Sequence, residues 1–234
     1  MNQNLQYVEG KTYSKAAEAL DKAAREFYSQ NRQMPIAHPI FVKRDGSLVF
    51  RPLTFRENLQ KKIDDFETLK NPDGSEKSMD ERFRLFRVCL SSCTGIAYKA
   101  NSAKFKIIPL CEQLVTIPKY FRKSSIFINY SGIKGIKLDS KNGKYCQRLA
   151  RKEVLKHSGW NIAVEEDRGL LEVYSKIVFD ALNEKAMGFY LSNRTSLDKL
   201  WPLVIDLGDI LSCANGANHL NIGTTLRVVH PKNA

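Results

Sequence analysis

The sequence predicts an α+β fold, with helices and short strands mixed in one globular domain. Three observations lead to this prediction. Apolar residues recur at three- and four-residue spacing in several stretches, which is typical of amphipathic helices. Short runs rich in β-branched and aromatic residues are typical of strands. These helices and strands follow one another without the regular alternation that a parallel sheet requires. With 234 residues, 43% of them hydrophobic, the chain is long enough to bury a core.

The first part of the chain predicts a helix and a hairpin. Residues 13–31 carry one apolar stripe and are expected to be helical. Residues 40–50 are expected to form a β-hairpin, because Asp45 and Gly46 suit the positive φ angles of a tight turn between hydrophobic flanks.

Two capping boxes open the next predicted helices. In residues 54–69, Thr54 and Glu57 have the spacing at which each side chain satisfies a free N–H of the first turn. Residues 78–100 begin with a second such box at Ser78, and their apolar residues predict one long helix.

The clearest internal break lies between these two helices, where Asn-Pro-Asp-Gly ends at residue 74. We therefore divide the chain into residues 1–74, a helix–hairpin–helix segment, and residues 75–234, the main α+β part. The first segment is either a small subdomain or part of the same domain.

The remaining elements follow from composition and periodicity. Predicted helices span residues 144–156 and 196–213, the latter with a disturbance at Pro202. Another predicted helix follows the acids Glu165, Glu166 and Asp167, which suit a helix start, and runs to about residue 183. Predicted strands are residues 104–109, 125–130, 187–191 and 224–229, and residues 114–117 form either a strand or a short helical turn.

Residues 119–156 stand apart from the rest of the chain by their charge. They hold eleven Lys and Arg against two acids, a net charge of +9, whereas the whole chain is net +12. Tyr120, Tyr130 and Tyr145 are interleaved with the charge. Cations attract phosphates and aromatic rings stack on bases, so this mixture indicates a nucleic-acid-binding surface, for DNA or RNA.

Within this stretch, a turn and one helix arc are the expected points of contact. Gly132 and Gly135 have the GXXG spacing of KH RNA-binding loops, but a strand is predicted before them, so we favour a turn between strands. In the predicted helix of residues 144–156, the cations share one arc. The expected phosphate-contacting residues are Lys119, Arg122, Lys123, Lys134, Lys137, Lys144, Arg148, Arg151, Lys152 and Lys156.

Two alternative functions remain open. Asp206 and Asp209, three residues apart on a predicted helix, could hold a divalent cation for a nuclease. Alternatively, the basic stretch could bind an acidic protein in an assembly, and the composition also leaves room for a homo-oligomer. We favour non-enzymatic binding.

Other chemistry has little support in the sequence. Cys89 and Cys93 have the spacing of one helix face, but no second pair completes a metal site, so we interpret them as core residues. Phosphate-loop and dinucleotide patterns do not occur, so no cofactor is expected. The sequence lacks a signal peptide or an apolar run long enough for a membrane span, so a cytoplasmic protein is expected.

Overall fold

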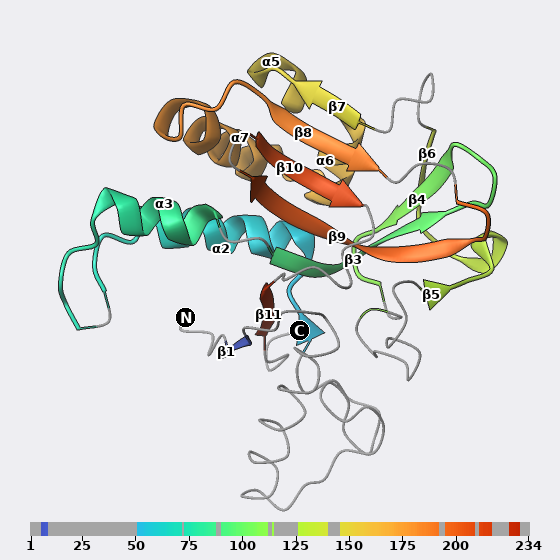
Figure 1. The fold of residues 1–234 in the computed structure, drawn as a ribbon, viewed down its shortest axis with the longest axis horizontal. Helices are drawn as coiled ribbons and strands as arrows, with labels where there is room; N and C mark the ends of the chain where they lie inside the picture. Colours follow the sequence, from blue (N-terminus) through green and yellow to red (C-terminus); the bar gives the residue numbers. More distant parts are fainter. Residues whose placement is uncertain are drawn as a thin grey trace, which may run out of the picture.

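The computed structural model describes residues 6–8, 51–71, 73–87, 90–111, 114, 126–139, 146–191, 195–208, 211–216 and 225–229. These residues form one eleven-stranded sheet with helices packed against it (Figure 1). The predicted α+β fold class is confirmed. The predicted helix of residues 13–31, the hairpin of residues 40–50 and most of residues 114–117 lie outside the described residues.

Two long strands form the centre of the sheet. β3 (Leu90–Tyr98) and β9 (Lys199–Gly208) pair antiparallel along most of their length. Their register shifts between Ser91 and Gly95, and Gly95 lies opposite Pro202. Proline has no N–H to donate to a ladder, so its place beside this irregularity lets a central strand contain it.

The two halves of the central pair have different outer neighbours. The other strands are β1 (Gln6–Val8), β2 (Arg51–Pro52), β4 (Lys104–Ile108), β5 (Ile126–Phe127), β6 (Ile136–Asp139), β7 (Cys146–Leu149), β8 (Met187–Leu191), β10 (Leu211–Gly216) and β11 (Thr225–Val229). Along one half, β11 with β1 and β2 follows β3, while β10, β8 and β7 follow β9. Along the other half, β4 and β6 follow β3, while β5 pairs with the start of β9.

Short local signals start the helices. The helices are α2 (Phe55–Glu67), α3 (Met79–Arg87), α5 (Arg151–Val154), α6 (Ser158–Ala163) and α7 (Arg168–Lys176), which continues as a π turn, η4 (Ile177–Ala181); η2 (Tyr130–Gly132) is a 3-10 turn. The capping boxes predicted before α2 and α3 are both present. Asp167 caps α7 by accepting the N–H of Leu170 at 3.0 Å, which confirms the predicted acidic helix start.

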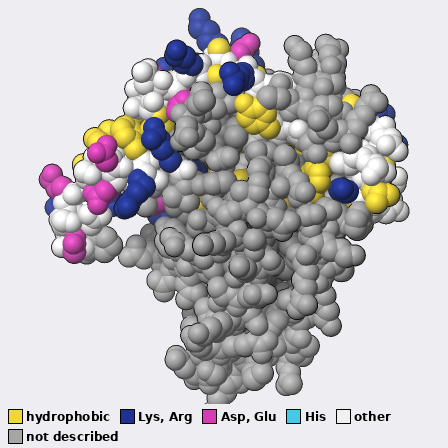
Figure 2. All heavy atoms as spheres, in the orientation of Figure 1, with side chains coloured by type: hydrophobic (Ala, Val, Ile, Leu, Met, Phe, Trp, Pro, Cys, Tyr) yellow, Lys and Arg dark blue, Asp and Glu magenta, His cyan; other side chains and the backbone are white. Residues whose placement is uncertain are grey.

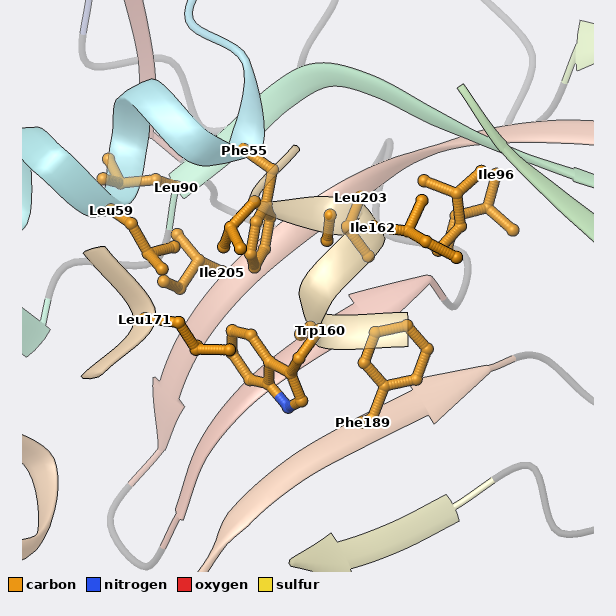
Figure 3. Packing of buried hydrophobic residues seen from close by; sticks show 14 of the residues in the cluster. Phe55, Leu59, Leu90, Ile96, Trp160, Ile162, Leu171, Phe189, Leu203 and Ile205 are labelled. Atoms are coloured by element: carbon orange, nitrogen blue, oxygen red, sulfur yellow. The ribbon is translucent and has the colours of Figure 1, made fainter. Parts of the chain in front are cut away.

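The core lies between the sheet and helices α2, α6 and α7 (Figure 3). Trp160 of α6 is its centre: the indole is fully buried, with ring centroids 5.6 Å from Phe55 of α2 and 6.3 Å from Phe189 of β8. Phe55 and Leu59 come from the segment of residues 1–74, so the described part of that segment shares the core of the main part.

Two of the predicted helices are wrong because their residues form strands. Residues 78–100 are helical only as far as Arg87, and β3 follows from Leu90. Within residues 196–213, Lys199–Gly208 form β9 and β10 begins at Leu211. Residues 92–98 are buried without interruption, so this part of the strand has no exposed face and lacks the alternation of buried and exposed residues that would distinguish it from a buried helix.

The predicted basic helix of residues 144–156 is also wrong in large part. Among the described residues of this stretch, Cys146–Leu149 form β7 and Arg151–Val154 are α-helical. A further helix, α6, begins at Ser158.

The strand predictions are more accurate than the helix predictions. Residues 104–109, 187–191 and 224–229 correspond to β4, β8 and β11. Of the described residues 126–130, Ile126–Phe127 form a strand, β5, and residues 128–130 do not. Among the described residues, no helix is both long and apolar enough to cross a membrane.

Candidate nucleic-acid interface

The structure describes the side chains of half of the ten predicted phosphate-contacting residues. Lys119, Arg122, Lys123 and Lys144 lie outside the described residues, and Lys137 is described only by its backbone in β6. The five described side chains are all exposed: Lys134, Arg148, Arg151, Lys152 and Lys156.

The glycine turn around Lys134 is held by a buried lysine. Lys106 of β4 is 5% exposed, and its Nζ donates to the carbonyl oxygens of Tyr130 at 2.8 Å and Ile133 at 2.6 Å. The Lys106 ammonium also lies 4.3 Å from the centroid of the Tyr130 ring. These contacts satisfy a buried cation and anchor the turn on β4, while Lys134 remains at the surface.

The second group of cations lies where β7 leads into α5. Successive side chains of a strand point to opposite faces, so Arg148, which is exposed, points away from Leu149, which is buried. Arg151 makes a bidentate ion pair with Asp180 of η4, at 2.6 and 3.0 Å. Lys152 and Lys156 follow on α5 and the turn after it.

The structure does not bring the turn and the second group together. Lys134 precedes β6, whereas the second group follows β7, and β4, β3, β9, β10 and β8 stand between these two strands in hydrogen-bonding order. Figure 1 shows β6 and β7 at separate edges of the sheet. The described cations therefore form two surfaces, and the single arc expected from a continuous helix is wrong.

One cation near α5 was missed in the sequence analysis. Leu149 pairs with Met187 in the antiparallel β7–β8 ladder, so the chain before β8 runs beside the start of α5. The exposed Lys185 belongs to this segment, two residues before β8. We call Arg148, Arg151, Lys152, Lys156 and Lys185 the basic corner. Antiparallel pairing of residues 146–149 with 187–191 is the signal that would have found Lys185.

Acids offset part of the positive charge of the basic corner. Two acids lie beside its cations, Glu153 of α5 and Asp180 of η4. Glu153 accepts the N–H of Ala150 at 2.7 Å in the α5 cap, and Asp180 is paired with Arg151. Figure 2 shows Lys and Arg side chains gathered at this end of the molecule, over α5 and β7.

The helix that was expected to carry the carboxylates of the predicted nuclease site is a strand at Asp206. Asp206 lies on β9, opposite Cys213 of β10, and not on a helix. Asp209 lies outside the described residues. Among the residues that the structure describes, no group of three or more His, Cys, Asp or Glu could hold a metal ion.

The prediction that Cys89 and Cys93 are core residues is confirmed for Cys93. Cys93 is fully buried, as expected of a core residue, but it lies on β3 and not on a helix. The backbone N–H of Cys111, also buried, donates to the Cys93 carbonyl at 2.9 Å. Cys89 lies outside the described residues.

Comparison with known proteins identifies a fold but no family. No family model matches the sequence, and no curated protein matches it. One solved structure is similar over 98% of both chains, with a TM-score of 0.57 and 13% identity; its description is "Accommodation of massive sequence variation in Nanoarchaeota by the C-type lectin fold". At this identity the likeness shows the fold alone: the chain is folded like a C-type lectin domain.

Proposed function

We propose that this chain is a non-enzymatic binding protein that recognises nucleic acid through the phosphates it presents to the basic corner. The observation that carries the proposal is the grouping of five exposed cations from β7, α5 and the segment before β8 on one edge of the sheet. Asp180 pairs with Arg151, so Arg148, Lys152, Lys156 and Lys185 are the exposed cations that the proposal assigns to phosphate.

The similar structure supports binding in preference to catalysis. Its description says that its C-type lectin fold accommodates massive sequence variation. A scaffold whose residues can vary so widely suits recognition of different partners, because catalysis requires fixed groups held in one geometry. Here the fold would hold the surface residues in place, and the charge of those residues would determine which ligand binds.

A salt titration of binding tests the proposal quantitatively. Each phosphate contact changes the slope of log K against log salt by about −0.9 for duplex DNA. Three or four contacts at the basic corner therefore predict a slope between about −2.7 and −3.6. We expect the double variant Lys152→Glu and Lys156→Glu to weaken binding and to reduce the steepness of this slope by about 2.

A matched control is available on the other surface. The double variant Lys104→Glu and Lys134→Glu changes the net charge by the same amount on exposed residues of the β4–β6 edge. Equal weakening by both double variants would show that only net charge matters, which contradicts a defined interface. Binding of polyglutamate as tight as that of nucleic acid would point to an acidic protein partner, and cleavage that requires magnesium would revive the nuclease alternative.

A further inference from the structure

His157 occupies an unusual position at the start of α6. Its Nδ1 accepts the backbone N–H of Trp160 at 3.2 Å, so this imidazole is the N-cap of the helix. Its Nε2 lies 3.0 Å from Oε1 of Gln147 on β7. Because Nδ1 acts as an acceptor, the ring carries its proton on Nε2 and donates it to Gln147.

The contact with the Trp160 N–H requires a neutral ring, whereas the contact with Gln147 does not. Protonation would place a hydrogen on Nδ1, which would then face the Trp160 N–H with no lone pair to offer. Burial of the ring lowers the pKa of His157 below its usual value of 6.5, because desolvation disfavours the charged form. The neutral ring is therefore part of how α6 is attached.

The residues around the ring connect this cap to the core. The imidazole packs on Phe189 with a centroid distance of 4.9 Å, and the same phenyl ring contacts Trp160. A Cβ on Gly159 would lie only 2.6 Å from Phe189, so α6 sits directly on β8 at this point. Loss of the cap therefore acts where the helix meets the sheet.

We propose that His157 makes the attachment of α6 to the sheet dependent on pH, with α6 firmly held when the imidazole is neutral and loosened when it is protonated. This inference does not depend on the nucleic-acid proposal. The trigger is protonation of the imidazole, which would occur in a compartment or medium of about pH 5.

The charged groups on the neighbouring elements do not offset this effect. Of the elements packed against the ring, α6 has no ionisable side chain, and β8 has only Tyr190. β7 carries Cys146 and the exposed Arg148, and α5 with its following turn carries Arg151, Lys152, Glu153 and Lys156, all of them exposed. The single acid among them is engaged with the Ala150 N–H, so no described carboxylate pairs with His157.

The sign of the dependence follows from the lowered pKa. Above about pH 6.5 the ring is neutral whether α6 is attached or not, and the attachment is complete. As the pH falls below 6.5, the detached ring binds a proton more readily than the capped ring. The opening equilibrium of α6 should therefore rise by up to about tenfold per pH unit, until the pKa of the capped ring is reached.

Hydrogen exchange on the full chain tests the proposal. The Trp160 amide should lose protection between pH 7 and pH 5, after correction for the intrinsic exchange rate. The Leu170 amide is an internal control, because its cap is the Asp167 carboxylate, whose pKa is lowered from 3.8 mainly by the Leu170 N–H and also by Arg56. That cap stays charged over the same range, so the Leu170 amide should keep its protection.

The variant His157→Asn separates capping from titration. Asparagine is a good N-cap but has no proton to gain, so α6 protection in this variant should not change with pH. Unchanged protection of the Trp160 amide in the unmodified chain, or an equal loss in His157→Asn, would overturn the proposal. If the variant does not fold, NMR titration of the His157 ring replaces it: a midpoint at or above pH 6.5 rejects the proposal, and one below 6.5 that coincides with the loss of protection supports it.

Discussion

At the scale of single residues, Gly159 and Gly169 show how packing decides the effect of one methyl group. Both glycines lie in helices, where alanine is favoured over glycine by about 1 kcal/mol. A Cβ on Gly159 would lie 2.6 to 2.9 Å from the buried Phe189 ring. A Cβ on the exposed Gly169 would meet only Oδ1 of Asp167, at 3.7 Å. Helix propensity therefore favours alanine at both sites, but an added methyl group would clash with Phe189 at Gly159 and would have space at Gly169.

We predict opposite changes in stability from the same substitution. Gly159→Ala should lower the free energy of unfolding by about 1–3 kcal/mol, because overpacking a filled core outweighs helix propensity. Gly169→Ala should raise it by up to about 1 kcal/mol. Urea denaturation of both variants measures the two values. A stabilised Gly159→Ala would show that α6 does not rest on Phe189 as described.

At the scale of elements, one carboxylate joins three segments. Oδ1 of Asp198 accepts the N–H of Ala100 at 2.7 Å, and Oδ2 accepts the N–H of Tyr130 at 2.9 Å. Asp198 itself immediately precedes β9, while its two donors follow β3 and β5. These two backbone donors are the main reason that the pKa of Asp198 lies below 3.8, with Lys99 adding a smaller effect.

The variant Asp198→Asn should therefore destabilise the protein in a pH-dependent way. Asparagine offers one acceptor oxygen for two donors, and one backbone N–H loses its partner, at a cost of about 1 kcal/mol where water has partial access. The contribution of the carboxylate is complete above pH 3.8 and is lost as the pH falls through the lower pKa of the folded state. The difference between variant and wild type should therefore shrink in strong acid.

Urea midpoints at pH 7, 5 and 3 measure this difference. Asp73→Asn is the control, because Asp73 also has a lowered pKa, but its partner is Ser75 in the same exposed loop. That substitution should leave the midpoint at pH 7 unchanged. An equal loss in the two variants would show that the Asp198 contacts do not join elements.

The helices and strands differ in how well the sequence predicts them. The starts of α2, α3 and α7 were predictable, because a cap is decided by a few neighbouring residues. β3 and β9 were not, because residues 92–98 and 200–205 are buried by partners distant in sequence and do not alternate with exposed residues. Pro202 carried the missed signal: a proline disfavours a helix interior, and here it lies in a strand.

The candidate site was predictable only in part for a related reason. Local charge counts found the exposed cations of α5, but they treated residues 144–156 as one helix. The strand β7 turns Arg148 to another face, and its ladder with β8 brings in Lys185. Neither effect can be read without knowing which strands pair. Composition therefore predicted that residues 119–156 are strongly basic, and the pairing of the strands determines how these cations are divided between two surfaces.

At the scale of the whole molecule, the charge is uneven. Residues 64–81, which include the end of α2 and the start of α3, hold seven acids and two lysines in a chain of net charge +12. Figure 2 shows Asp and Glu side chains at that end, away from the cations over α5 and β7. Such polarity would orient a polyanion toward the basic corner as it approaches.

The shared central strands also determine how the molecule unfolds. β3 and β9 run through both halves of the sheet, so neither half can lose its strands without disrupting the other. The sequence has two tryptophans, and they report on different places. Trp160 lies in the core with α2 and β8, whereas Trp201 packs on Tyr98 at a centroid distance of 5.0 Å. We therefore expect one cooperative transition seen by both indoles.

Fluorine NMR of the protein labelled with 5-fluorotryptophan can follow both sites through a urea titration. The two native signals should disappear with the same midpoint. Gly159→Ala, near Trp160, and Asp198→Asn, near the start of β9, should each lower both midpoints together. If each variant shifted only the nearer signal, the halves would unfold independently. The continuous β3–β9 pair requires the opposite, because the strand that holds Trp201 at one end supplies Leu203 and Ile205 to the core at the other.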